Sequence, residues 1–275
     1  MRCGVSLKFA LVTLLLASPL AASAAASKCD RLIATGGADN PPFLWRDPQN
    51  PKRLVGANAD LLKRIADSLD LKLDLLYTGD AEQALEEVTS GRMDVLADAS
   101  PTLQKLTQLD FIHPSITKLE TSAWVRSDPG FLYASRDDLS GRTGNYIVEA
   151  ELGDELRAYA KDHLVLDTAP NLDQAMQRLL GGNIDYVLHE RYSAVAQLGP
   201  LGLLDVVQRL ERPVSSRGMH LAVAHDSACN GPWLRGQLAV KMTELQEANV
   251  PEQLLAENIE RWRQQQSVVE RDTQR

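Results

Sequence analysis

An internal repeat is the feature that most constrains how this chain can fold. In each copy a helix pattern ends at a glycine, and an aspartate then precedes an apolar run of strand length. The copies are Gln83-Ala84-Leu85, Gly91, Asp94 and Val95-Leu96-Ala97, then Gln174-Ala175-Met176, Gly182, Asp185 and Tyr186-Val187-Leu188. A recurring helix–strand unit predicts two similar α/β lobes. Chance similarity of two such units is the alternative, and the shared order of the features favours a structural repeat.

The rest of the chain alternates short apolar runs with amphipathic helices in the same way. Residues 32–35 predict a strand. Asn58 is expected to cap a helix that begins there and carries Leu61, Leu62, Ile65 and Leu69 on one face. Residues 221–224 predict a strand that returns to the first lobe, before two C-terminal helices and a polar tail after Gln264. A chain that leaves one lobe and comes back crosses between them twice, so we expect a two-strand hinge.

These patterns divide the chain into two lobes. Residues 27–125 and 214–265 are expected to form lobe 1, residues 126–213 to form lobe 2, and residues 266–275 to be the tail. The fold class expected is therefore α/β, as a clamshell of two lobes.

The first 26 residues have the layout of a secretory signal peptide. Arg2 and Lys8 supply a positive start, residues 9–16 are apolar apart from Thr13, and small residues at 21–26 offer cleavage sites. The apolar run is shorter than the roughly 20 residues of a membrane helix. We expect residues 1–26 to be removed and the mature chain to be exported.

The charge and the cysteines narrow the function further. A formal net charge of −8 disfavours nucleic acid, whose binding needs clustered Lys and Arg. Cys3 leaves with the signal peptide, so Cys29 and Cys229 remain. In an oxidising compartment two thiols favour one disulfide, and two separate cysteines are the alternative.

Motifs for metals and cofactors are missing from the sequence. The five histidines have no metal-binding spacing, and no P-loop, nucleophile elbow or dinucleotide fingerprint occurs. We therefore expect neither a metal nor a cofactor.

A series of short motifs resembles the bacterial extracellular solute-binding proteins of family 3, the periplasmic receptors of polar amino-acid ABC transporters. The motifs are Pro41-Pro42-Phe43, the block 56–62, Ser90-Gly91-Arg92-Met93-Asp94-Val95, Ser100-Pro101-Thr102, Asp110-Phe111, Leu139-Ser140-Gly141 and Gly182-Asn183-Ile184-Asp185. The resemblance implies a monomer in the periplasm that closes its two lobes on a small ligand. It also implies delivery of the ligand to a permease in the inner membrane.

The resemblance also implies positions for ligand-binding residues, with departures from the family pattern. Glu190 falls where an aspartate takes the ligand ammonium, and Lys105 falls where an arginine clamps the ligand carboxylate. Lysine lacks the planar fork with which arginine holds a carboxylate. Ala81 stands in place of an aromatic platform, and Asp98 in place of a glycine at a strand end.

We therefore expect Asp98 and Glu190 to hold the cationic end of a ligand. Lys105, with Ser100 and Thr102, is expected to hold an anionic end, and Phe43 to line the site; these residues are the candidate set. The alternatives are that Asp98 caps a helix, that Ser100 and Thr102 only stabilise a turn, and that Phe43 packs in the core.

The function expected is a binding protein for a small, polar, amine-bearing ligand, without catalytic activity. One alternative is an enzyme similar to cyclohexadienyl dehydratases, with Glu190 as an acid. Another is a receptor that presents its closed form to a sensor or a periplasmic partner instead of a permease.

Overall fold

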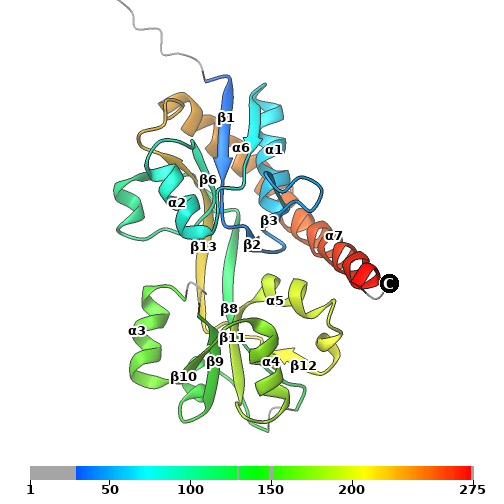
Figure 1. The fold of residues 1–275 in the computed structure, drawn as a ribbon. Helices are drawn as coiled ribbons and strands as arrows, with labels where there is room; N and C mark the ends of the chain where they lie inside the picture. The colour runs from blue at the N-terminus through cyan, green and yellow to red at the C-terminus, as the bar shows by residue number, and fades with distance from the viewer. Residues whose placement is uncertain (1–28, 129, 149–151, 274–275) are drawn as a thin grey trace, which may run out of the picture.

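The protein is described by a computed structural model that covers residues 29–128, 130–148 and 152–273. It has two α/β lobes joined by a pair of long strands (Figure 1). The signal peptide predicted for residues 1–26 lies outside the described residues. In the part of the chain that is described, no helix is both long and apolar enough to cross a membrane.

Lobe 1 holds the N-terminal strands and both C-terminal helices. Its elements are β1 (Arg31–Thr35), β2 (Asp39–Asn40), β3 (Leu44–Arg46), β4 (Leu54–Val55), α1 (Ala57–Ser68), β5 (Lys72–Leu75), α2 (Ala81–Thr89), β6 (Val95–Ala99), η1 (Lys105–Thr107), β7 (Leu109–Phe111), α6 (Pro232–Glu247) and α7 (Val250–Thr273). Lobe 2 holds η2 (Arg136–Leu139), β9 (Thr143–Ile147), α3 (Asp154–His163), β10 (Val165–Ala169), α4 (Leu172–Leu180), β11 (Tyr186–Glu190), α5 (Arg191–Leu198), η3 (Leu203–Asp205) and β12 (Val207–Arg209).

The two lobes share one continuous set of paired strands. The strand order is β10-β9-β11-β8-β13-β6-β1-β5, with β12 on β8 and β7 on β13. Only β8 (Thr117–Arg126) and β13 (Ser215–Ala224) pass from one lobe to the other among the described residues, and Figure 1 shows them crossing side by side. The predicted two-lobed α/β fold with a two-strand hinge is therefore confirmed.

The crossing lies within β8, before the boundary expected at Arg126. Thr121 of β8 already pairs with Glu190 of β11 in lobe 2, while Thr117–Thr121 pairs with β13. The sequence does not mark this point because β8 continues through the hinge as one regular strand.

The internal repeat is present in three dimensions. Gly91 and Gly182 end their helices with φ of 74° and 73°, a left-handed conformation that favours glycine. Asp94 then accepts a hydrogen bond from the Ile33 amide at 2.8 Å, and Asp185 accepts one from Thr143 at 2.9 Å. Each aspartate thus anchors its strand to a parallel neighbour, β1 in lobe 1 and β9 in lobe 2.

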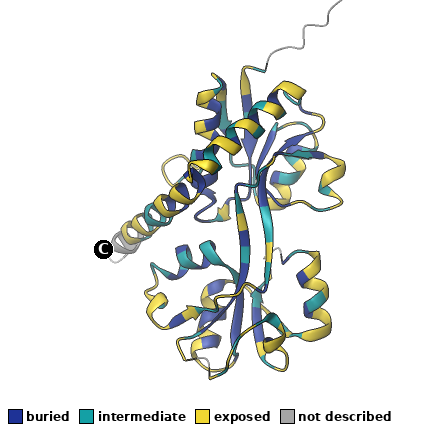
Figure 2. Cartoon of the chain, turned by 180° about the vertical axis from the view of Figure 1, so that it is seen from behind, coloured by how far each residue is buried: buried dark blue, intermediate teal, exposed yellow. Residues whose placement is uncertain are grey.

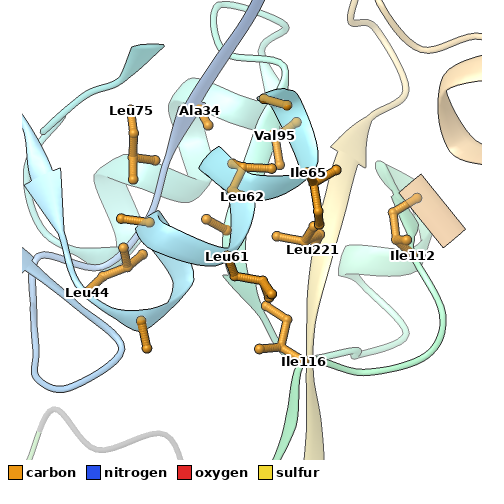
Figure 3. Close-up of a cluster of buried hydrophobic side chains, with 14 of the residues drawn as sticks. Ala34, Leu44, Leu61, Leu62, Ile65, Leu75, Val95, Ile112, Ile116 and Leu221 are labelled. Atoms are coloured by element: carbon orange, nitrogen blue, oxygen red, sulfur yellow. The ribbon is translucent and has the colours of Figure 1, made fainter. Parts of the chain in front are cut away.

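Each lobe has a hydrophobic core of its own. In lobe 1, α1 packs Leu61, Leu62 and Ile65 against the sheet residues Val95 and Leu221 (Figure 3). In lobe 2, alternate strand residues pack on opposite faces of the sheet, against α4 and α5 on one side and near α3 on the other. Two cores joined by a narrow ladder allow the lobes to move relative to each other.

Asn58 does not cap α1, contrary to the expectation. Gly56 occupies the N-cap position without a side-chain hydrogen bond. Asn58 lies inside the first turn, buried, and its Nδ2 donates to the carbonyl oxygen of Ala97 at 2.8 Å. The amide side chain satisfies a buried strand carbonyl, a use that sequence spacing does not indicate.

Helix α7 continues to Thr273, beyond Gln264, where a polar tail was expected to begin. Trp45 supports this extension: its ring meets that of Trp262 edge-on at 5.5 Å, and its Nε1 donates to Gln265 at 2.9 Å. Figure 2 shows exposed residues along the outer side of this helix and buried residues within each lobe.

The predicted disulfide is confirmed. Cys29 and Cys229 are bonded, with Cα atoms 5.1 Å apart. The bridge ties the start of β1 to the turn between β13 and α6, and both cysteines pack against the lobe 1 core.

Candidate ligand-binding site at the hinge

The repeated strands β6 and β11 bring candidate residues from both lobes toward the hinge. Asp98 lies in β6 and Ser100 directly follows it, while Glu190 ends β11. Both strands adjoin the hinge ladder: β6 pairs with β13, and Glu190 pairs with Thr121 of β8. Ligands of open α/β sheets bind beyond the carboxyl ends of strands, where these residues lie.

Glu190 has the most unusual environment of the candidate set. Burial raises the pKa of its carboxyl to about 7, against the opposing effect of a hydrogen bond from the Ser193 amide. That amide donates to Glu190 Oε2 at 2.8 Å, as the N-cap of α5. Oε1 is buried and has no hydrogen-bond partner among the described residues. A buried carboxylate oxygen without a partner is costly, and a ligand ammonium would satisfy it.

His189 is a second buried polar residue at the same strand end. Burial lowers the pKa of its imidazole to about 4, so the ring is neutral at neutral pH. Neither ring nitrogen has a hydrogen-bond partner in the described parts of the chain. Ser122, its cross-strand neighbour, has a buried Oγ that also has no hydrogen-bond partner among the described residues. In the sequence, His189 stands out only as the residue next to Glu190.

Asp98 organises the loop that follows β1. Its Oδ2 accepts a hydrogen bond from the Gly37 amide at 2.9 Å, across parallel strands β1 and β6. The carboxylate therefore fixes the Gly36–Gly37 turn rather than capping a helix. Its contact with a ligand stays a prediction.

Ser100, Thr102 and Lys105 lie on one segment that runs from the end of β6 to the start of η1. The Oγ1 of Thr102 accepts from the Lys105 amide at 3.1 Å, which is the turn chemistry that was the alternative for this residue. Ser100 is only 4% exposed, and its Oγ accepts from Arg217 Nε at 3.2 Å. The ligand contacts of this segment stay predictions.

Arg217 is a residue of this region that the sequence analysis missed. It lies on β13, whose register places it opposite Leu119 of β8 in the hinge ladder. Arg217 lies four residues before the strand predicted at 221–224, and nothing local linked it to Ser100.

Phe43 lies in the core of lobe 1. Its side chain is fully buried, and its ring meets that of Tyr192 edge-on with centroids 6.1 Å apart. Tyr192 belongs to α5, so this contact crosses between the lobes. In this conformation the ring packs in the core, which was the alternative for this residue.

Replacement of Phe43 separates a core role from a ligand-binding role. Phe43→Ala is expected to lower the free energy of unfolding by about 4 kcal/mol, because it leaves a cavity where the ring was. Phe43→Leu keeps most of the apolar volume and is expected to cost less than about 1.5 kcal/mol. Urea unfolding measures both values. Unaltered ligand affinity in Phe43→Leu would assign Phe43 to the core, and a large loss there would restore it to the site.

Helix α5 makes further contacts between the lobes. Ser193 Oγ donates to Asn40 Oδ1 at 2.6 Å, beside the capping contact with Glu190. Arg191 forms an ion pair with Glu120 of β8 at 3.1 Å. The environment of Glu190 is therefore coupled to the arrangement of the lobes.

The structure also has two hollows that none of the candidate residues line. The smaller has a volume of about 220 Å³ and lies between Trp45, Gln197 and Trp262. The larger, about 510 Å³, is lined by Lys118, Glu120 and the start of α7. Side chains alternate along a strand, so Lys118 and Glu120 face away from Leu119 and its partner Arg217.

The described residues contain no cluster of three or more His, Cys, Asp or Glu side chains that could hold a metal ion. The candidate residues near the hinge offer carboxylates, hydroxyls and cationic side chains. Such groups bind polar and charged solutes through hydrogen bonds and ion pairs.

Solved structures with this fold include a ligand-binding core, a transporter substrate-binding protein and a sensor domain. The GluR0 ligand-binding core in complex with L-glutamate has a TM-score of 0.64 at 17% identity, with 84% of this chain and 97% of that chain covered. The amino-acid ABC transporter substrate-binding protein AbpA from Streptococcus pneumoniae Canada MDR_19A, bound to L-arginine, has a TM-score of 0.62 at 19% identity, with 85% and 96% covered. A histidine kinase sensor domain similar to periplasmic binding proteins has a TM-score of 0.63 at 22% identity, with 82% and 95% covered.

No curated protein sequence matches this chain. The family profile of the bacterial extracellular solute-binding proteins, family 3, matches residues 32–190, which include β1, the repeated strands and Glu190. With the two-lobed fold and the strand-end residues, this match assigns the chain: it belongs to the bacterial extracellular solute-binding proteins of family 3.

Proposed function

We propose that this chain is a periplasmic binding protein that captures a small, polar, amine-bearing ligand for an ABC importer. The observation that carries the proposal is Glu190, a buried carboxyl with one oxygen unpartnered among the described residues. An ammonium group supplies both the positive charge and the hydrogen-bond donors that such a carboxylate needs.

Amino acids are the ligand class that the comparisons favour. The neighbouring structures hold L-glutamate in one case and L-arginine in two others. We propose that Glu190 and Asp98 take the cationic end of the ligand. Ser100, Thr102 and Lys105 would line the part of the site that holds the anionic end of the ligand.

A binding screen tests this function. The mature protein is heated in the presence of single amino acids, polyamines, dipeptides or small organic acids, and positive compounds are then titrated by calorimetry. A ligand of the folded state raises the melting temperature by mass action, by about 2.7 kcal/mol of stability at 100 times its Kd. Stabilisation by amines or amino acids supports the proposal. Tight binding confined to compounds without an amine would contradict it.

A catalytic role is the second candidate, because a carboxyl with a pKa near 7 is suited to act as an acid at neutral pH. In this version Glu190 would protonate the leaving hydroxyl of a substrate similar to prephenate or arogenate, which departs as water while the ring carboxylate leaves as CO2 and its bonding electrons make the ring aromatic. Turnover of either compound, abolished in Glu190→Gln, would establish the enzyme. Binding without turnover would leave the receptor function.

A further inference from the structure

We propose that helices α5 and α7 form a latch that holds the two lobes together before a ligand binds. The latch consists of α5 (Arg191–Leu198) in lobe 2, α7 (Val250–Thr273) in lobe 1, and residues 39–45 of lobe 1 beside them. Its effect on the lobes is measured in the empty protein, and only its effect on affinity rests on the proposed function.

Helix α7 is fixed to lobe 1 along its first half. Leu254 and Leu255 are buried in the lobe 1 core, and Asn258 Nδ2 donates to Asp60 Oδ2 of α1 at 2.9 Å. Farther along the helix, the edge-on contact of Trp262 with Trp45 supports the part that reaches α5. The helix is therefore a rigid extension of lobe 1.

Helix α5 has one face for each lobe. Ala194 and Leu198, one helical turn apart, are fully buried in the lobe 2 core. Ser193 and Gln197, also one turn apart, lie on the neighbouring face, which is turned toward lobe 1. Because the first face belongs to the lobe 2 core, α5 moves with lobe 2, and its second face leaves lobe 1 whenever the lobes separate.

Contacts with lobe 1 occur at both ends of α5. At its start, Tyr192 packs against the lobe 1 core, and Ser193 Oγ donates to a side chain of lobe 1 at 2.6 Å. At its far end, Gln197 lines the hollow of about 220 Å³ together with Trp45 and Trp262. The contact at Gln197 involves no residue of the candidate set, so it can be altered without altering the proposed ligand contacts.

Glu190 links the latch to the candidate site. One of its oxygens caps α5, and the other, which has no partner among the described residues, is the proposed contact for the ligand ammonium. A ligand that needs both lobes binds only the fraction of molecules in which the lobes are together. Its apparent Kd is the intrinsic Kd divided by that fraction. A latch that raises the fraction therefore tightens binding without touching the ligand.

The first experiment loosens the latch from each side in the empty protein. Trp262→Ala removes the ring on α7, and Gln197→Ala shortens the side chain that faces it from α5. Trp233→Ala, which alters an exposed tryptophan on α6, is the control. Small-angle X-ray scattering of the mature protein measures the radius of gyration. We expect a rise of about 1 Å in Trp262→Ala, on a value of about 18 Å for a compact chain of this length, and no change in the control.

The second experiment measures affinity by titration with L-arginine, L-glutamine and L-glutamate. A compound that binds wild type is expected to bind Trp262→Ala about fivefold to tenfold more weakly, and Gln197→Ala about threefold more weakly. The double variant Gln197→Ala/Trp262→Ala should be no weaker than Trp262→Ala, because the two side chains act through one contact. Independent losses within each lobe would multiply instead. Trp233→Ala should bind like wild type.

An unchanged radius of gyration in both single variants would overturn the inference, as would tighter binding by either of them or multiplied losses in the double variant. If Trp262→Ala fails to fold by circular dichroism, Gln197→Ala decides the question, because Gln197 is a half-buried polar residue outside the lobe 2 core. If none of the three amino acids binds wild type, that result counts against the proposed function alone, and the scattering comparison still supports or overturns the latch.

Discussion

Affinity for an amine-bearing ligand is expected to rise about tenfold between pH 6 and pH 8. The ligand ammonium pairs with ionised Glu190, and a carboxyl with a pKa of about 7 is only about one-tenth ionised at pH 6. Above pH 7 most of the carboxyl is ionised, so the affinity should level off. His189, whose pKa is about 4, stays neutral across this window and contributes no change in charge.

Glu190→Gln is expected to remove this pH dependence and to weaken binding at pH 8 at least about 100-fold. The amide keeps the shape of the side chain and loses its charge, which leaves the ligand ammonium without its ion-pair partner in a buried site. Calorimetric titrations at four pH values measure both effects. In wild type below pH 7 they should also show a proton released on binding, as a dependence of the apparent enthalpy on the buffer.

Glu211→Gln is the matched control, because Glu211 is an exposed carboxylate of lobe 2 that lies outside the paired strands. It should bind like wild type at every pH. A pH profile of wild type that is flat from 6 to 8, or a Glu190→Gln variant that binds normally, would remove Glu190 from the site.

The same carboxyl sets a pH dependence of stability in the empty protein. Its folded pKa is raised above the unfolded value, so between about pH 4.5 and 7 the folded state holds a proton that the unfolded state has released. This contribution to the free energy of unfolding is present at low pH and is lost as the pH rises through 7. In Glu190→Gln the decline should be absent.

Removal of the disulfide is expected to have the largest effect on stability. The bridge links residues 200 positions apart, and a loop of that size contributes about 5 kcal/mol by restricting the unfolded chain. The double variant Cys29→Ser/Cys229→Ser should therefore melt about 15 °C below wild type. Differential scanning calorimetry measures the shift.

Ligand affinity should change little in this double variant, because the start of β1 lies at the far end of lobe 1 from the hinge (Figure 1). Reduction of wild type with dithiothreitol is the control and should lower the melting temperature by the same amount. The double variant itself should be insensitive to the reductant. An unchanged melting temperature in both experiments would show that the bridge does not constrain the chain.

Most elements of the fold were predictable because their determinants are local. Asp80 caps α2 with Gln83 in a capping box, a pattern readable over a few residues. Gly91 and Gly182 end their helices at matching places in both lobes, which made the repeat visible. Where a polar side chain served a distant partner instead, as Asn58 serves Ala97, the local reading was wrong.

The candidate site was predictable only in part. Glu190 could be named because it lies at a strand end and falls where the family has an aspartate, but its unpartnered oxygen and raised pKa come from the packing around α5. Phe43 was expected to line the site, yet Tyr192 from the other lobe covers it. Burial by a distant segment leaves no mark on the sequence around the buried residue.

The sequence by itself determined the class of this protein: two α/β lobes, a hinge of two strands, a disulfide and a carboxylate at the end of β11. Periodicity, helix ends and cysteine content are properties of the sequence itself, so they can be recognised without knowing which segments pack together. Only the tertiary structure decided which groups meet. Ser100 and Arg217 are 117 residues apart in the chain and hydrogen-bonded in space, because the register of β13 with β8 and β6 brings the returning strand alongside the first lobe. That register depends on the packing of both lobes at once, and no local pattern encodes it.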